Sequence, residues 1–416
     1  EGLKHGDPLG SPGHAQDCKT GDPAEAFLPH GLGPSVHWGT QHGFVHSCSE
    51  TVSTLGEQRL RQLGHIARSA ETWLRAEEET SLVFGGDSAE VLDSIPDRSI
   101  DLIVTDPPYH VTKKQNIHGD THFESDDQYL EWLGGIAASW RRVLRPNGSL
   151  YCFCDSSMAG RIEELLRPNY NVLAHIVWTK PNEPGFDGWK GKMKKEALRQ
   201  WYPHSERVIF AEPAVEGPLF RSYFAQFLRD ARTRAGLSQH KLTELVGAYG
   251  KVNHGGAVSN WEAGRNTPSP EQYRKICEAV LNTGQVDQMP PYEDVVRPFN
   301  IDPSRPFTDV WDFPSVRPYR GKHPAEKPLD LLEHIIRTSS NEGDIVLDCF
   351  AGSGSTAVAA AALGRKSISI EVVDKWIEAI LKRVAQTDQD QSSDEGGLSH
   401  KSRMMPRDQL PLFSAG

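Results

Sequence analysis

Short apolar runs alternate along this chain with segments whose apolar residues recur at helical spacing, and this alternation constrains the fold most. The runs predicted to be strands are 81–84, 102–105, 149–154, 172–179, 207–210, 344–347 and 366–371. The segments predicted to be helices are 127–143, 158–166, 328–338, 355–363 and 375–384. Strands that alternate with helices build a mostly parallel sheet covered on both faces. The sequence therefore predicts an α/β fold.

Other segments depart from this alternation. Residues 1–50 are rich in Gly, Pro and His without a periodic apolar pattern, and residues 387–416 form a polar tail, so both predict disorder. Residues 51–80 predict one leading amphipathic helix. Residues 217–288 predict helices only, with more Arg and Lys than acids. This small helical insert separates two α/β segments, 81–216 and 289–386.

Composition narrows the class of protein. The chain lacks the roughly twenty consecutive apolar residues of a membrane helix, and its polar beginning lacks the apolar core of a secretory signal. The six scattered cysteines do not form a disulfide framework, so we expect a cytoplasmic protein. His42, His46 and Cys48 lack a fourth ligand at suitable spacing, and no metal is expected. The net charge of −11 counts mildly against nucleic acid as a partner, although phosphate contacts need only a local basic surface.

The run LIVTDPPY ends an apolar strand abruptly in a carboxylate, two prolines and an aromatic ring. Pro107 and Pro108 fix φ and remove two backbone donors, so the turn is stiff. Asp106 and the carbonyl of Pro107 can each accept one hydrogen of an amino group, and Tyr109 offers a flat face to a base. The alternative is a simple Pro-Pro turn after a strand that carries an Asp.

This arrangement of acceptors fits a particular reaction. The exocyclic amine of adenine or cytosine is a poor nucleophile, because its lone pair is delocalised into the ring. Two fixed acceptors favour the localised form that attacks a sulfonium methyl group, which stabilises the transition state selectively. A base in duplex DNA reaches such a pocket only when it is flipped out.

The run DIVLDCFAGSGST joins an apolar strand to an alanine-rich helix through a glycine-rich turn. About twenty residues past Asp348 the next strand ends at Glu371. A tight glycine turn lets a ligand approach the backbone, and an acid after the next strand can bind ribose hydroxyls. A dinucleotide site, or a glycine turn without a ligand, has the same pattern.

Together these motifs resemble the bacterial amino-methyltransferases of DNA, in the permuted (beta) order in which the catalytic turn precedes the glycine loop. The resemblance covers most of the chain from residue 85 to about 384. Further family-like blocks follow in the expected sequence: WRRVLRPNGSLYCFCD, HIVWTKPNEPG, HSERVIFAEP and HPAEKPLDLLEHIIRTSS. The resemblance implies a Rossmann-like fold that depends on S-adenosylmethionine, and double-stranded DNA as substrate.

The resemblance also implies roles for individual residues. The catalytic set that binds the amine and stacks the base is Asp106, Pro107, Pro108 and Tyr109. The cofactor candidates lie at strand ends and in the glycine loop: Asp87, Ser88, Asp348, Phe350, Ala351, Gly352, Ser353, Gly354, Thr356 and Glu371, with Lys327 and Ser339 as weaker ones. Glu371 would bind the ribose, and Asp87 and Ser88 would line the adenine end. For Lys327, the interpretation as a surface lysine at the start of a helix explains the sequence equally well.

The residue before Pro-Pro-Tyr bears on the target base. An aspartate there resembles the adenine-modifying members, whereas cytosine-N4 members more often carry a serine. A carboxylate is a stronger acceptor than a hydroxyl, so adenine is expected and cytosine-N4 remains the alternative. A regulator that binds DNA without turnover is the rival class, and methylation of RNA or protein is a third interpretation.

The helical insert resembles the helix-turn-helix of small phage-type repressors, although the link before its recognition helix is expanded by GAYGKVNHGG. Ser238 is expected to cap a helix. Gln239, Ser259, Asn260 and Arg265 are the DNA-binding candidates. Trp261 and Ile276 are expected in the core. The insert lies where this family hosts target recognition, and it is compatible with a phage origin or a location at the bacterial nucleoid.

The polar tail ends in a short apolar peptide. Gln409, Leu410, Leu412 and Phe413 resemble the peptide that bacterial proteins insert into the replication sliding clamp. The alternative is a tail that docks on its own domain.

Overall fold

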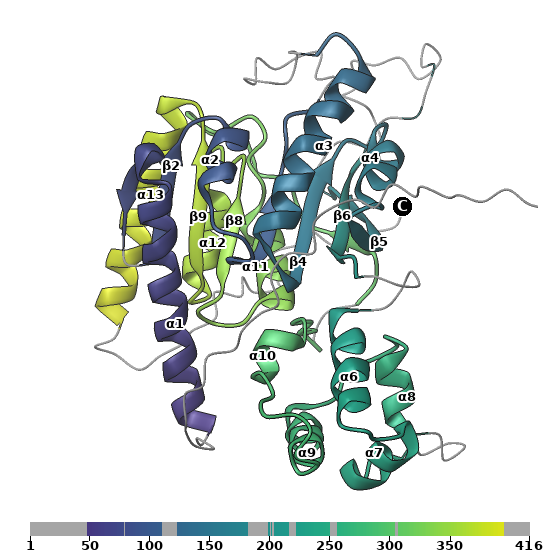
Figure 1. Cartoon of the computed structure of the whole chain (residues 1–416). Coiled ribbons are helices and arrows are strands. Elements are labelled where there is room, and N and C mark those ends of the chain that lie inside the picture. Colours follow the sequence, from purple (N-terminus) through teal and green to yellow (C-terminus); the bar gives the residue numbers. More distant parts are fainter. Residues whose placement is uncertain are drawn as a thin grey trace, which may run out of the picture. The chain divides into compact units, whose positions relative to one another are not determined.

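A single mixed sheet organises the part of the chain that the computed structural model describes, residues 48–78, 80–109, 123–181, 199, 201, 204–215, 222–249, 256–303 and 307–394 (Figure 1). The strand order is β1-β2-β9-β8-β3-β4-β6-β5-β7. The strands are β1 (Leu74–Glu77), β2 (Ser81–Gly85), β3 (Ile100–Thr105), β4 (Leu144–Cys154), β5 (Tyr170–Thr179), β6 (Ser205–Pro213), β7 (Val310–Asp312), β8 (Ile345–Asp348) and β9 (Lys366–Glu371). From β2 to β4 the neighbours are parallel, whereas β1 and β6 run antiparallel to theirs. The predicted α/β fold is confirmed.

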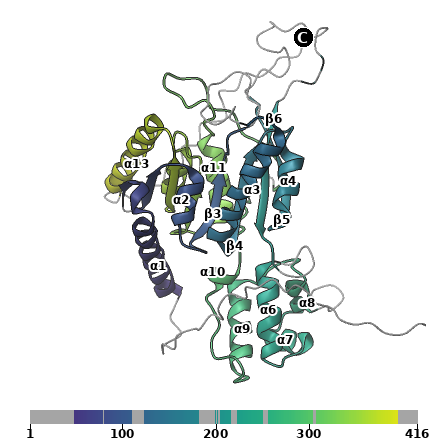
Figure 2. The same cartoon turned by 45° about the horizontal axis from the view of Figure 1, so that its top comes forward.

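Helices cover both faces of this sheet (Figures 1 and 2). Those of one face are α1 (Cys48–Ser69), α2 (Ser88–Ser94), α3 (Asp126–Val143) and α4 (Ala159–Leu166), and those of the other are α11 (Leu329–Ser339), α12 (Ser355–Ala362) and α13 (Asp374–Asp394). Side chains of β3 alternate between the two layers: Ile103 packs with the first set, and Leu102 and Val104 with the second. All three are buried, as expected for a strand with helices on both sides.

A helical module lies between β6 and β7. It consists of α6 (Tyr223–Arg234), α7 (Gln239–Val246), α8 (Ala257–Glu262), α9 (Pro270–Leu281) and α10 (Tyr292–Val295). The module has an apolar cluster of its own, in which Trp261 and Ile276 are buried as expected. Ser238 caps α7, because its side chain accepts a hydrogen bond from Lys241 N at 3.0 Å. The cluster includes Val296, which lies past the predicted boundary at residue 288.

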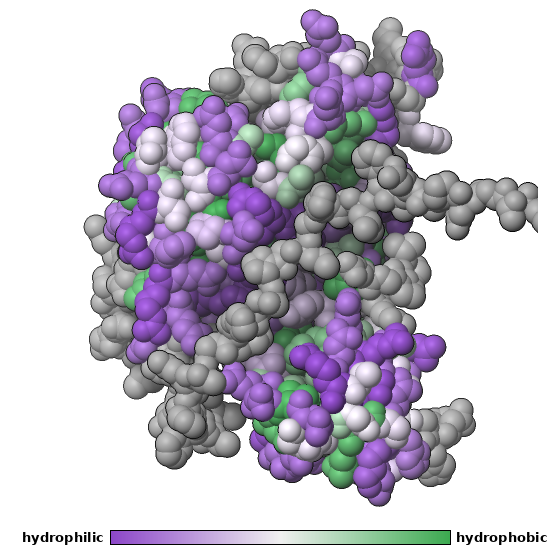
Figure 3. All heavy atoms as spheres, viewed as in Figure 1, coloured by the Kyte–Doolittle hydropathy of each residue, from purple (hydrophilic) through white to green (hydrophobic). Residues whose placement is uncertain are grey.

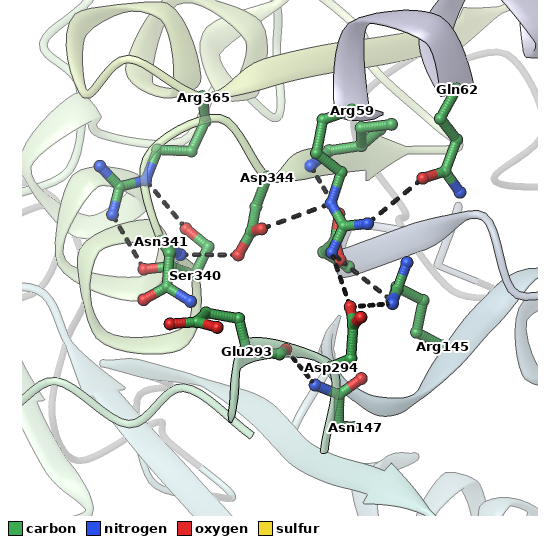
Figure 4. A network of polar contacts seen from close by, with 12 residues as sticks. Arg59, Gln62, Arg145, Asn147, Glu293, Asp294, Ser340, Asn341, Asp344 and Arg365 are labelled. Carbon is green, nitrogen blue, oxygen red and sulfur yellow. Dashed lines mark hydrogen bonds and ion pairs between the residues drawn. The ribbon is translucent and has the colours of Figure 1, made fainter. Parts of the chain in front are cut away.

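A polar network joins this module to the amino ends of the central strands (Figure 4). Asp294 of α10 pairs with Arg145 of β4 at 2.6 Å, and Glu293 O accepts a hydrogen bond from Asn147 at 2.8 Å. Arg59 of α1 pairs with Asp101 of β3 at 2.8 Å. Charged groups from α1, β3, β4 and α10 therefore meet at the amino ends of the central strands.

The structure corrects several predicted boundaries. The leading helix ends at Ser69 rather than near residue 80, because Leu74–Glu77 pairs antiparallel with β2 as an edge strand. Helix α13 continues to Asp394, past its predicted end at 384 and into the predicted tail. Residues 1–50 were predicted to be disordered, but helix α1 begins at Cys48. Residues 1–47 and 395–416 lie outside the described part. Helix α2 and strands β1 and β7 were not predicted.

Within the described ranges, no helix has both the length and the apolar character that a membrane crossing requires. The same ranges contain no group of three or more His, Cys, Asp or Glu side chains arranged to hold a metal ion.

Candidate active site

The two sequence motifs meet at the carboxyl ends of two neighbouring strands. Strands β3 and β8 are parallel, with Ile103 opposite Leu347. The chain continues from β3 toward β4 on one side and from β8 toward β9 on the other. Ligands of open α/β sheets bind at the crevice where the strand order reverses in this way. Asp106 and the glycine loop 350–354 therefore share the edge at which this fold binds ligands.

The two carboxylate oxygens of Asp106 differ in whether a described residue donates a hydrogen bond to them. Its Oδ2 accepts a hydrogen bond from the ammonium of Lys327. Its Oδ1 is buried, and none of the described residues donates to it within ordinary distance and angle limits. Burial and the carboxylate of Glu206 raise the pKa of Asp106, and the Lys327 ammonium and the nearby Tyr109 hydroxyl oppose that rise. The Tyr109 hydroxyl has one proton, which it donates to Glu206, so Oδ1 of Asp106 is left as an acceptor. A buried acceptor without a donor is costly unless a ligand satisfies it.

Two residues that the sequence did not single out complete the charged cluster. Glu206 at the start of β6 lies with Oε2 at 3.6 Å from Lys327 Nζ, and the Tyr109 hydroxyl donates to the same oxygen at 3.3 Å. Its other oxygen pairs with Lys180, which directly follows β5. Lys327 also lies 5.8 Å from the ring centroid of Tyr109 and 5.1 Å from that of Phe153.

The charges in this cluster stabilise one another. Burial alone would raise the pKa of Glu206, but the ammonium groups of Lys327 and Lys180 lower it below its usual range. Burial alone would lower the pKa of Lys327, but the carboxylates of Asp106 and Glu206 raise it. Lys327 is thus held as a cation and Glu206 as an anion at neutral pH.

The glycine loop is folded around Asp348, the last residue of β8. Thr356 Oγ1 donates to Asp348 Oδ2 at 2.6 Å, and Phe350 N donates to Oδ1 at 3.1 Å. Burial raises the pKa of Asp348 to about 7. Gly352 and Gly354 have φ values of +52° and +79°, a region that favours glycine.

The predicted ribose-binding acid lies next to this loop. Glu371 ends β9, and its Oε2 accepts a hydrogen bond from Gly352 N at 2.9 Å. Its Oε1 accepts from the amides of Val372 and Val373. Arg383 of α13 donates to Ser353 O at 3.0 Å. Glu371 and Arg383 therefore both hold the loop, through Gly352 N and Ser353 O.

The remaining cofactor candidates lie in three places. Asp87 follows β2 and caps α2 by accepting from Ala89 N at 2.9 Å, and Ser88 Oγ donates to Cys349 O at 2.5 Å, so both lie beside the glycine loop's strand. Ser339 is buried in α11 and shares a 2.8 Å hydrogen bond with Tyr151 inside the sheet–helix layer. Lys327 contacts the catalytic turn, as described above.

The DNA-binding candidates lie on α7, on α8 and in the turn after α8. Gln239 Nε2 donates to Glu262 Oε2 at 2.6 Å, so its amide is engaged within the module. Ser259 and Arg265 are exposed, and Arg265 donates to Asn260 Oδ1 at 3.1 Å. The face of the module seen in Figure 3 is mixed, with hydrophobic spots surrounded by hydrophilic surface.

Comparison with known proteins places the chain in a family. A family model described as DNA methylase matches residues 100–382, more than half of the chain and both motifs. The DNA adenine methyltransferase YhdJ of Escherichia coli (strain K12) is 28% identical over 309 residues, which are 74% of this chain and 83% of that protein. The type II methyltransferase M2.MboI of Moraxella bovis is 21% identical over 330 residues, 75% of this chain and 90% of that one. A crystal structure of an M1.HpyAVI–SAM complex matches with a TM-score of 0.42 and 19% identity, covering 73% of this chain and 98% of that one. The chain belongs to the N6/N4 DNA methylase family.

Proposed function

We propose that this DNA methylase transfers a methyl group from S-adenosylmethionine to the 6-amino group of adenine, on a base flipped out of duplex DNA. The observation that carries the proposal is Oδ1 of Asp106, a buried acceptor without a donor among the described residues, next to the glycine loop. An amino hydrogen of the target base satisfies that oxygen. The stiff turn at Pro107 and Pro108 holds the acceptor in place.

The reaction needs no covalent intermediate. S-adenosylmethionine, when bound, supplies a methyl group on a sulfonium sulfur. The lone pair of the amine would form the new C–N bond, and the electron pair of the donor's C–S bond would be left on sulfur. One amine proton passes to Oδ1 of Asp106 and then to water. Asp106 favours the localised lone pair, and Tyr109, half-buried beside it, offers the stacking face.

The residues at the strand ends fit such a methyl donor. The positive φ of Gly352 and Gly354 lets the loop turn tightly after β8, and His323 and Ile380 fill the space beside these two glycines. The small side chains of Ala351 and Ser353 leave the rest of the loop backbone open to a ligand. The carboxylates of Asp348 and Glu371 follow neighbouring strands and flank that loop. We infer that Glu371 binds the ribose, Asp87 and Ser88 the adenine end, and the loop the methionine part.

Adenine is the proposed base because Asp106, rather than a serine, precedes the two prolines. The carboxylate accepts more strongly than a hydroxyl. The relative in Escherichia coli is named a DNA adenine methyltransferase. The order of motifs, with the catalytic turn at residue 106 before the glycine loop at 350, supports assignment to the permuted beta class.

We propose that the helical module acts in target recognition as a helix-turn-helix, with α7 and α8 as its two central helices. The expanded link between these helices is bridged by backbone pairing of Tyr249 with Gly256. Exposed Ser259 and Arg265 would face DNA, whereas the amide of Gln239 donates a hydrogen bond to Glu262.

Arg265→Met should weaken DNA binding and reduce the slope of log K against log salt concentration by about 1. An unchanged salt slope would assign DNA binding to another surface.

The activity is tested with radiolabelled S-adenosylmethionine and duplex DNA lacking prior methylation, followed by nucleoside analysis. N6-methyladenine supports the proposal, whereas N4-methylcytosine corrects the base and keeps the mechanism. In Asp106→Ala we expect loss of methyl transfer with retained DNA binding. If the wild-type protein binds both S-adenosylmethionine and DNA but transfers nothing, the rival class, a DNA-binding regulator without turnover, is correct.

A contact with the replication sliding clamp remains a proposal carried by the sequence alone. Gln409, Leu410, Leu412 and Phe413 lie outside the described residues. Binding of a synthetic peptide of residues 405–416 to the purified clamp, with Leu412 and Phe413 replaced by alanine as control, tests it.

A further inference from the structure

We propose that Lys327 is a positioning residue for methyl transfer: it occupies Oδ2 of Asp106, so that this carboxylate offers the amine one fixed oxygen, Oδ1, beside the carbonyl of Pro107. The inference rests on the proposed function and deepens it. It assigns Lys327 to the catalytic turn instead of the cofactor, and it gives Glu206 the task of anchoring Lys327.

Lys327 is fixed from several directions. Its side chain is only 10% exposed, and its ammonium lies between the carboxylates of Asp106 and Glu206. Rings of Tyr109 and Phe153 lie within 6 Å of the same nitrogen, at 5.8 and 5.1 Å from their centroids. The next residue, Pro328, precedes α11 and has a fixed φ. A lysine held in this way is a rigid donor rather than a flexible surface cation.

The segment that carries Lys327 also reaches the glycine loop. The preceding residue, Glu326, accepts a hydrogen bond from Arg383 at 3.3 Å, and Arg383 donates to Ser353 O at 3.0 Å. The ring of His323 lies close above Gly352, where an added Cβ would come within 3.0 Å of it. One short segment therefore sets Asp106 and the methyl-donor loop in a common frame. In-line transfer demands this kind of mutual placement.

The charges around Asp106 explain why the cation is needed. Burial and the carboxylate of Glu206 both disfavour a negative charge on Asp106, whereas the ammonium of Lys327 favours it. Without Lys327, Asp106 would face Glu206 in a buried site, and its carboxyl would hold its proton to higher pH. A protonated, freely rotating carboxyl group is a poorer acceptor for the amine.

The test compares Lys327→Met, Lys327→Arg and Glu206→Gln with Lys382→Met, which removes a lysine of α13 outside the charged cluster. Three quantities are measured: the dissociation constant for S-adenosylmethionine, the single-turnover rate on duplex DNA as a function of pH, and the pKa of Asp106. The pKa comes from ¹³C-carboxyl NMR, with the resonance assigned by its absence in Asp106→Asn. The NMR titration reports on the ion pair whether or not DNA is the substrate.

In Lys327→Met we expect S-adenosylmethionine binding within about twofold of wild type and a rate at pH 7.5 lowered by roughly 10²–10³-fold, the loss seen when one positioned donor is removed. The acid limb of this variant's pH–rate profile should move to higher pH, so that raising the pH restores part of the rate. Lys327→Arg should keep the limb near that of wild type. Glu206→Gln should not move it upward, because the neutral amide no longer repels the Asp106 carboxylate. Lys382→Met should match wild type.

Each contrary result has a distinct meaning. An unchanged Asp106 pKa and pH profile in Lys327→Met would overturn the inference. Loss of S-adenosylmethionine binding with an unshifted profile would make Lys327 a cofactor ligand and overturn it too. If wild-type protein transfers no methyl group to DNA, the proposed function fails, while the NMR titration still decides whether Lys327 holds Asp106 ionised.

Discussion

Thr356 donates a 2.6 Å hydrogen bond to Oδ2 of Asp348, which joins the first turn of α12 to the end of β8. The other oxygen of Asp348 accepts the amide of Phe350 at 3.1 Å. The buried carboxylate of Asp348 therefore fixes the start of the glycine loop through these two hydrogen bonds. Burial is the main cause that raises its pKa to about 7, so the shape is kept at a cost in stability when the group is charged.

Asp348→Asn should stabilise the protein at alkaline pH. The folded-state pKa of about 7 lies above the usual value of 3.8, so the contribution of Asp348 is fully present below pH 4 and is lost as the pH rises through 7. The asparagine keeps the size and removes the charge. Urea unfolding from pH 4.5 to 8 should show the variant gaining on wild type as the pH rises. Asp93→Asn, an exposed change in α2, should show no such trend; if both variants behave alike, burial of Asp348 is not the cause.

Gly354→Ala should destabilise the loop. Gly354 has φ of +79°, and an added Cβ would lie 3.0 Å from the side chain of Ile380 and 3.3 Å from its backbone. Strain of this kind costs about 1–3 kcal/mol. Gly135→Ala is a matched control, because nothing lies within 4 Å of its added Cβ inside α3. The control should raise the melting temperature, since alanine favours a helix by about 1 kcal/mol over glycine. Equal effects of the two changes in a thermal melt would contradict the argument.

Glu262→Ala should loosen the helical module selectively. Glu262 pairs with Arg232 and accepts from Gln239 at 2.6 Å, and its side chain is 5% exposed. Removing one partner of a buried pair costs about 3–5 kcal/mol, because the other charge is left uncompensated. Hydrogen exchange should rise in residues 222–296 and stay unchanged in the sheet. Glu278→Ala breaks an exposed pair with Arg274 and should cost under about 0.5 kcal/mol.

Arg59→Met should destabilise the protein more at pH 8 than at pH 5. Arg59 is 4% exposed, pairs with Asp101 at 2.8 Å and lies 3.7 Å from Asp344 (Figure 4). Burial and the neighbouring Asp101 raise the pKa of Asp344 to about 7, so this acid is charged at pH 8 and mostly neutral at pH 5. The loss at pH 8 should be about 3–5 kcal/mol. Arg61→Met, an exposed change in α1, is the control, and a pH-independent loss would exclude Asp344 as the cause.

The sequence predicted the central strands well, because strands buried on both faces are uninterrupted apolar runs. β3 and β8 are of this kind. Edge strands lack that signature. Residues 74–77 form β1 with alternating half-exposed positions, and the spacing of Trp73 and Leu74 also fits a helix, so the leading helix was predicted too long. Tertiary pairing, here with β2, decides such a case.

The candidate site was predicted only where its residues follow a motif. Asp106 and Glu371 are marked by abrupt ends of apolar strands. Glu206 carries no such mark, since its partners Lys180, Tyr109 and Lys327 come from three distant parts of the chain. Gln239 lies on the predicted helix, but its amide is engaged by Glu262, a contact that helical spacing does not show.

The strand order β2-β9-β8-β3 also determines when this protein can become an enzyme during its synthesis. Strands β2 and β3 leave the ribosome early, yet they are not neighbours, and the two strands that fill the gap between them are made last. The growing chain therefore carries two open strand edges through the synthesis of the whole helical module. Such edges invite pairing with other chains. These two edges therefore have to stay unpaired with other chains until β9, which ends at residue 371, has left the ribosome.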